Sequence, residues 1–215
     1  MFHFPTLYEM LVIVPAVVLG LAFHEFAHAL AADSLGDRTA RYQGRLTLNP
    51  LAHVDAVGLV MLFLAGFGWA RPVPVNPFNF RGDKKRGLLL VSLAGPAANL
   101  ALAVLGAVVL GVFLGLGGGL ALTPAARDVL LGIIRINAVL AVFNLLPVPP
   151  LDGSKILAGI LPGRQEWLYT LENYGVLILL VLLFTGVIGR ILGFFISPLY
   201  RALLDLAREV ASFRF

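Results

Sequence analysis

The chain has 215 residues, of which 59% are hydrophobic and 13% charged, and its mean hydropathy is +0.91. This composition is typical of a multi-pass membrane protein and leaves no room for a separate soluble domain. The formal net charge of +4 includes no long basic run, so we expect basic loops that face lipid head groups and no nucleic acid partner. The absence of cysteine excludes disulfides and thiolate metal sites, so any metal must be held by histidine and oxygen ligands.

The first predicted element is an apolar helix from Leu7 to Ala32, which is long enough to cross the roughly 30 Å hydrocarbon layer. It contains His24, Glu25 and His28 in the pattern H-E-x-x-H. Residues four apart share one face of a helix, so both imidazoles can reach one ion, and the motif is typical of zinc sites whose glutamate is a general base. The motif also occurs by chance, but polar side chains within a lipid-facing helix are costly without a function.

After the first helix come a polar segment, a short apolar segment and a proline-rich segment. Between Asp33 and His53, the stretch Arg45-Leu46-Thr47-Leu48 alternates as expected of a short strand. The apolar run from Ala56 to Ala70 is short for a full crossing, and the prolines between Arg71 and Pro77 favour extended backbone. Extended backbone at membrane depth must be covered by protein or by a water-filled cavity. We therefore predict that residues 56–77 form a re-entrant or shallow element that lines the site.

Two long helices are predicted after this element. The first follows Lys84-Lys85-Arg86, and small residues recur along it at every fourth position from Gly95 to Gly111. Such a ridge lets another helix approach closely, and we interpret Asn99 within it mainly as structural support that hydrogen-bonds between helices. The second helix runs from about Thr123 to Leu146.

Three prolines end that helix, and Asp152-Gly153 begins a short helix through Leu161. Asp152 has two possible roles. It can cap the short helix, or it can supply the third protein ligand that a catalytic zinc ion needs beyond two histidines. Further along, Leu168 to Ile188 is predicted to span the membrane, and Ile191 to Phe215 to span it or lie at its surface.

Four segments together resemble the site-2 protease family of intramembrane zinc metalloproteases, in its compact form without PDZ or CBS domains. They are His24-Glu25-Phe26-Ala27-His28, Gly68-Trp69-Ala70-Arg71-Pro72-Val73-Pro74-Val75-Asn76-Pro77, Ala94-Gly95-Pro96-Ala97-Ala98-Asn99, and Asn144-Leu145-Leu146-Pro147-Val148-Pro149-Pro150-Leu151-Asp152-Gly153. The resemblance implies that His24, His28 and Asp152 ligate one zinc ion (Zn2+) per chain. It implies that Glu25 is the catalytic base and that Asn144 binds the substrate or polarises its carbonyl. It also implies regulated intramembrane proteolysis, with a membrane-spanning protein or peptide as the substrate.

The predicted fold class is an all-α polytopic membrane protein. We expect a helical bundle of about 4–6 transmembrane segments with a small re-entrant, extended β-like element. The bundle is predicted to be a single domain over residues 1–215, with a core over about residues 7–161 and C-terminal helices over residues 166–215. The alternative function is a non-proteolytic membrane protein that binds or transports a divalent metal. A transporter needs several ligand sites along a path and no glutamate beside the histidine pair, so the protease is favoured.

A shared metal also constrains the topology. The His24–His28 pair and Asp152 must lie at a similar depth, which requires that residues 56–70 do not cross the membrane fully. Most lysines and arginines then fall on one face, and the positive-inside bias makes that face cytoplasmic. We therefore expect a multi-pass protein of the cell membrane whose active site lies towards the cytoplasmic side.

Overall fold

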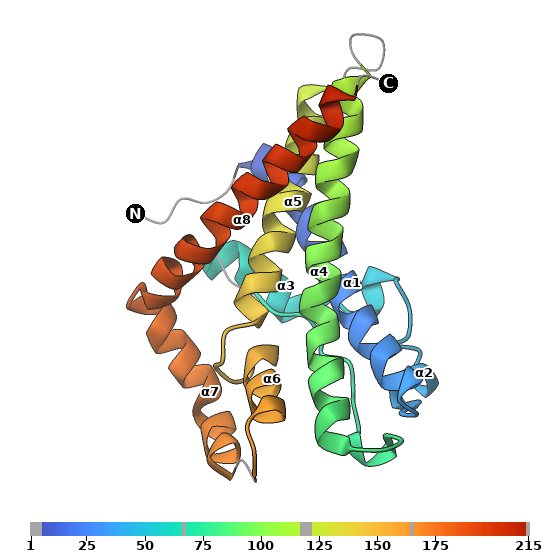
Figure 1. Ribbon diagram of the computed structural model, residues 1–215. Coiled ribbons are helices and arrows are strands. Elements are labelled where there is room, and N and C mark those ends of the chain that lie inside the picture. The colour runs from blue at the N-terminus through green and yellow to red at the C-terminus, as the bar shows by residue number, and fades with distance from the viewer. Residues whose placement is uncertain (1–5, 66–67, 117–121, 164–165, 214–215) are drawn as a thin grey trace.

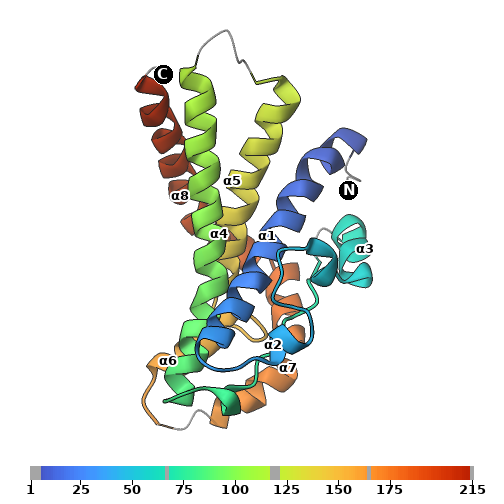
Figure 2. The ribbon, with the colours of Figure 1, turned by 90° about the vertical axis from the view of Figure 1, so that its right-hand side faces the viewer.

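The structure is a computed structural model that describes residues 6–65, 68–116, 122–163 and 166–213. Within these ranges the regular elements are helices, and one isolated antiparallel bridge joins Val54 to Ala70 (Figures 1 and 2). The predicted all-α class is therefore confirmed. In chain order the elements are α1 (Leu7–Ser34), α2 (Thr39–Tyr42), η1 (Pro50–Ala52), α3 (Ala56–Ala65), η2 (Pro77–Asn79), α4 (Lys84–Gly115), α5 (Pro124–Asn144), α6 (Asp152–Ile160), α7 (Glu166–Phe184) and α8 (Val187–Ser212).

Helix α4 is the central element of the bundle, and α1, α5, α6 and α8 all pack against it (Figure 1). Helices α1, α4 and α8 are each long and apolar enough to cross a membrane. The 28 residues of α1 correspond to about 42 Å of helix, more than the hydrocarbon layer requires. The protein is thus a multi-pass helical membrane protein.

The starts of α1, α4 and α5 are fixed by local side-chain caps. Thr6 accepts a hydrogen bond from the backbone N–H of Glu9, whose carboxylate accepts in turn from the N–H of Thr6. Asp83 caps α4 and Thr123 caps α5 in the same position, and each accepts from the N–H three residues later. These caps satisfy N–H groups that have no partner inside the helix.

Small residues allow the helices around α4 to approach closely. Ala103 and Ala107 of α4 pack in one buried cluster with Ala138 of α5 and Ala207 of α8. A Cβ atom on Gly111 would lie 2.5 Å from the carbonyl oxygen of Ala207, so α8 could not pack there against a larger residue. The part of the predicted small-residue ridge from Ala103 to Gly111 is a contact surface of α4 for both α5 and α8.

Helix α3 and the segment after it correspond to the predicted re-entrant or shallow element. Helix α3 has ten residues and covers only a small part of the height of the bundle (Figure 2). Residues 71–76 belong to no helix or paired strand, and the backbone of Asn76 is extended. We call residues 70–76 the strap. The strap lies along α1, and the ten residues of α3 are too few to cross the hydrocarbon layer as a helix. The re-entrant or shallow position of this segment in the membrane stays a prediction.

Two details of the sequence-based assignment were wrong. The predicted strand over Arg45-Leu46-Thr47-Leu48 does not form, because no strand pairs with it within the described ranges and the Arg45 side chain bonds strap carbonyls instead. The predicted span from Leu168 to Ile188 ends earlier, at Phe184. Gly186 follows with φ of +73°, a conformation that favours glycine, and Ile188 belongs to α8.

Candidate metal centre

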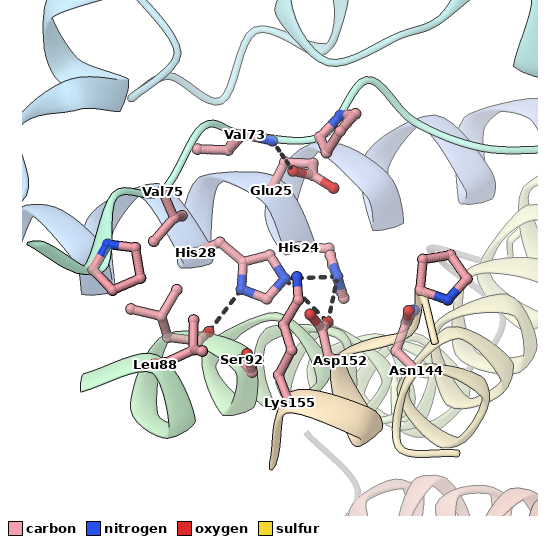
Figure 3. Close-up of a pocket in the computed structure, with 14 residues that line it drawn as sticks. His24, Glu25, His28, Val73, Val75, Leu88, Ser92, Asn144, Asp152 and Lys155 are labelled. Atoms are coloured by element: carbon pink, nitrogen blue, oxygen red, sulfur yellow. Dashed lines mark hydrogen bonds and ion pairs between the residues drawn. The ribbon is translucent and has the colours of Figure 1, made fainter. Parts of the chain in front are cut away.

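Three potential metal ligands from α1 and α6 meet at one point (Figure 3). The Nε2 atoms of His24 and His28 are 2.9 Å apart, as expected for residues one helical turn apart. Asp152 is the first residue of α6, and its Oδ2 lies 3.1 Å from Nε2 of His28 and 3.2 Å from Nε2 of His24. All three side chains are buried. The fold therefore joins a motif within α1 to a carboxylate that lies 124 positions after His28.

The proton positions on both imidazoles are set by partners on α4. Nδ1 of His24 lies 2.7 Å from Oδ1 of Asn99, and Nδ2 of Asn99 donates to the Gly20 carbonyl and to Asn137. Because the amide nitrogen is engaged in donation, the atom that faces His24 is the amide oxygen, which accepts a hydrogen bond from the N–H at His24 Nδ1. Nδ1 of His28 donates to the carbonyl of Val91 at 2.7 Å. Each imidazole thus carries its proton on Nδ1 and turns the lone pair of Nε2 towards the meeting point.

This arrangement fits a divalent cation. Two nitrogen lone pairs and a carboxylate oxygen face one another in a buried place, and such acceptors repel unless a positive charge lies among them. Ligand atoms around a tetrahedral zinc ion are about 3.3–3.6 Å apart, given bonds of about 2.0–2.2 Å. The three separations here are 2.9, 3.1 and 3.2 Å. Two histidines and one carboxylate are a donor set typical of catalytic zinc, which keeps a fourth position open.

The structure argues against one of the two roles considered for Asp152, that of a helix cap. The N-cap residue of α6 is Leu151, and no side chain caps this helix. Asp152 lies one position later, and its carboxylate is turned to the two imidazoles. The helix-cap interpretation therefore does not account for this residue.

Glu25 lies beside the histidine pair and contacts the strap. Its side chain is 8% exposed, and its Oε2 accepts a hydrogen bond of 2.8 Å from the backbone N–H of Val73 (Figure 3). This contact joins α1 to the proline-rich segment, which the sequence predicted to lie beside the site. One carboxylate oxygen is held by the strap, so the orientation of the group depends on where the strap lies.

A cavity of about 550 Å³ opens at the three potential ligands and Glu25. The strap supplies one wall through Pro72, Val73 and Val75, which confirms that this segment lines the site. Asn144, at the end of α5, also lines the cavity, and its Nδ2 donates to the Leu140 carbonyl at 3.0 Å. Asn144 is thus near the ligands, with its donor occupied by its own helix.

Gly95 lets α4 come close enough to hold the histidines. A Cβ atom at this position would lie 2.5 Å from His24 Cε1 and 2.5 Å from His28 Nε2. No side chain fits between α4 and the imidazoles, and the closeness brings Asn99 and Val91 to the two Nδ1 atoms. Gly95 belongs to the ridge that the sequence indicated, but its contact with the motif could not be inferred from spacing.

The sequence analysis missed the outer partners of the site. Asn99 was interpreted mainly as support between helices, and the structure adds that it fixes the tautomer of His24. The only sequence signal was an amide inside an uncharged apolar helix, which marks a polar contact but not its partner. The bond from Val73 to Glu25 had no signal beyond the prediction that the proline-rich segment lines the site.

A buried cluster of two histidines and an aspartate beside a glutamate, within a bundle of membrane-crossing helices, defines a metallopeptidase type of site. Comparison with known proteins agrees. The family model described as "Peptidase family M50" matches residues 119–186. The chain is 44% identical over 176 residues to "Putative zinc metalloprotease YwhC" of Bacillus subtilis, a match that covers 80% of each chain. It is 35% identical over 184 residues to "Putative zinc metalloprotease Rip2" of Mycolicibacterium smegmatis, covering 84% of this chain and 69% of that one. No solved structure matches the chain.

The chain therefore belongs to peptidase family M50, the site-2 protease family, and is a zinc metallopeptidase. Its cofactor is zinc, in agreement with the fit of the three converging side chains.

Proposed function

We propose that this protein is an intramembrane zinc protease that hydrolyses peptide bonds within membrane-spanning proteins or peptides, as in regulated intramembrane proteolysis. His24, His28 and Asp152 ligate the zinc ion and Glu25 is the catalytic base. The observation that carries the proposal is the convergence of three buried acceptors with Glu25 at their side. A site that only binds or transports a metal has no need for that glutamate.

The chemistry follows from the positions of the side chains. A zinc ion held by His24, His28 and Asp152 would polarise the scissile carbonyl and lower the pKa of a bound water to about 7. Glu25 accepts the proton of the attacking water and delivers it to the leaving amine. Asn144 turns its amide from the Leu140 carbonyl towards the substrate carbonyl oxygen, where it donates a hydrogen bond as negative charge develops.

The strap is proposed to bind the substrate as an added strand. A scissile bond must be in extended conformation, because carbonyls inside a helix are already hydrogen-bonded. The N–H and C=O of Val75 and the C=O of Val73 form no hydrogen bond within the described part of the chain. These groups lie along a cavity wall and can pair with an extended peptide beside the ligands.

The site is proposed to face the cytoplasm. The end of α1, the start of α4 and helix α6 lie at the same end of the bundle, whereas α5 begins at the other end (Figure 1). The basic residues Arg38, Arg41, Arg81, Lys84, Lys85 and Arg86 belong to the first of these ends. By the positive-inside bias that end is cytoplasmic in the cell membrane. From Glu25 to Asp33 α1 rises by about 12 Å, so the zinc site lies at about that depth below the surface.

The test is cleavage of a single-span substrate by the purified, zinc-loaded protein in lipid vesicles. The wild-type protein should cleave it, and Glu25→Gln should abolish cleavage while zinc stays at one ion per chain, because the amide cannot accept the proton. Glu209→Gln is the matched control, since this exposed residue of α8 lies outside the site, and it should keep full activity. Equal turnover by Glu25→Gln, or a wild-type protein that binds zinc but cleaves no membrane-spanning segment, would contradict the proposal.

A further inference from the structure

A buried arginine holds the strap from the side opposite Glu25. Arg45 follows α2 and is 8% exposed. Its Nη2 donates to the carbonyl of Arg71 at 2.5 Å and to the carbonyl of Pro72 at 3.3 Å. Its Nε has no hydrogen-bond partner, and among the described residues no carboxylate pairs with it. A guanidinium that is buried without an ion pair is costly, so its position beside the strap needs a reason.

One peptide group links this arginine to the catalytic base. The Pro72 carbonyl faces Arg45, and the N–H of the same peptide unit, which belongs to Val73, donates to Glu25 at 2.8 Å. In a trans peptide the C=O and the N–H point in opposite directions. The negative end of the peptide dipole therefore meets the cation, and the positive end meets the carboxylate. Both contacts favour the same orientation of this peptide unit.

The strap has few other ways to hold this peptide unit. Pro72 and Pro74 have no N–H, so they cannot donate to a neighbouring strand. The ends of the strap are fixed elsewhere: Arg71 N–H donates to the His53 carbonyl at 2.7 Å, and Asn76 N–H donates to the buried Asp37 carboxylate at 2.6 Å. Between these anchors, the carbonyl side of the strap is held by Arg45.

The charges of Arg45 and Glu25 also interact across the strap. Burial lowers the pKa of Arg45, the nearby Arg71 lowers it further, and the Glu25 carboxylate acts in the opposite direction. Arg45 and Glu25 thus carry opposite charges on the two sides of the 72–73 peptide.

We propose that Arg45 is a positioning residue for Glu25, which acts through the Pro72–Val73 peptide to hold the carboxylate where it accepts the proton. The proposal rests on the role of Glu25 in the proposed function. An error of about 1 Å in the position of a catalytic group can cost about 100-fold in rate. Loss of Arg45 should therefore lower kcat even though Arg45 touches neither the ligands nor the substrate.

The experiment compares Arg45→Met with Arg45→Lys, which keeps a charged donor, and with the control Arg38→Met, which removes an exposed arginine of the same loop. Steady-state cleavage, zinc content and the hydrogen exchange rate of the Val73 amide are measured on zinc-loaded protein. Glu25→Ala calibrates the exchange signal, because it removes the acceptor of that N–H. Exchange is measured without substrate, so this arm tests the role of Arg45 even if the wild-type protein cleaves nothing.

We expect Arg45→Met to lower kcat by about 10- to 100-fold, with KM within about threefold, zinc at one ion per chain and faster exchange at Val73. Arg45→Lys should recover most of the kcat and of the Val73 protection. Arg38→Met should match the wild type. If Arg45→Met does not fold, Arg45→Gln replaces it, and it should likewise lower kcat and speed exchange at Val73.

Three results would overturn the proposal. The first is that Arg45→Met has the same kcat and the same exchange rate of the Val73 amide as the wild type. The second is a rise in KM with kcat unchanged, which would assign Arg45 to substrate docking alone. The third is a parallel loss of zinc and activity that Arg45→Lys does not correct, which would make Arg45 a residue of general stability.

Discussion

Gly95→Ala should empty the metal site while leaving the fold intact. The added methyl group would lie 2.5 Å from His24 Cε1 and from His28 Nε2, about 0.9 Å less than the 3.4 Å at which ordinary contact begins. Metal–ligand distances tolerate only about 0.2 Å. The imidazoles cannot retreat without leaving their acceptors on α4, Asn99 and the Val91 carbonyl. We therefore expect zinc affinity to fall by at least about 100-fold, or about 2.7 kcal/mol.

Competition with a chelator of known affinity measures this change, and cleavage should fall in parallel. Alanine is a better helix former than glycine by about 1 kcal/mol, so the helix itself should not be weakened. Gly193→Ala is the matched control, because a Cβ atom at Gly193 of α8 meets nothing within 4 Å. It should bind zinc like the wild type. Unchanged zinc affinity in Gly95→Ala would refute the packing of α4 against the two histidines and the ligand geometry built on it.

Three further predictions follow from the site and the topology. Asp152→Ala should lower both zinc content and activity, because two histidines alone make an incomplete site; wild-type zinc affinity in a chelator titration would exclude Asp152 as a ligand. Asn144→Ala should keep zinc and lower kcat by about 100-fold, since a donor to the substrate carbonyl is lost, and unchanged turnover would leave Asn144 with a structural role only. Single Gln43→Cys and Arg86→Cys variants place exposed thiols before and after α3 in a chain without cysteine. A membrane-impermeant reagent should label both only from the cytoplasmic side, and labelling from opposite sides would mean that the intervening segment crosses the membrane.

Local features of the site could be read from the sequence because they depend on a single helix. His24 and His28 are four residues apart, and helix geometry alone places them on one face. The apolar runs also predict the long helices, since length and hydropathy decide whether a segment can cross a bilayer. A re-entrant or shallow position of residues 56–77 is predicted for the same kind of reason, because ten to fifteen apolar residues followed by prolines are too short for a crossing.

Sequence reasoning failed where a partner decides the local structure. The alternation from Arg45 to Leu48 matches a strand, but a strand forms only beside another strand. Here the guanidinium of Arg45 bonds the carbonyls of Arg71 and Pro72 instead. The boundary between α7 and α8 was missed because Gly186 alone changes the chain direction within a continuous apolar run.

The full site was decided by tertiary structure. From the sequence alone, Asp152 could equally well cap a helix. The packing of α6 against α4 is what brings its carboxylate to the two imidazoles. The sequence does not indicate that Asn99 orients His24. It also does not indicate that the backbone N–H of Val73 holds Glu25. The sequence determines which side chains can ligate a metal and on which helix face they lie. The contacts that complete the site join residues 48 to 124 positions apart, so they depend on how closely whole helices pack. Small residues such as Gly95 permit close packing, but they do not specify which helix packs against them.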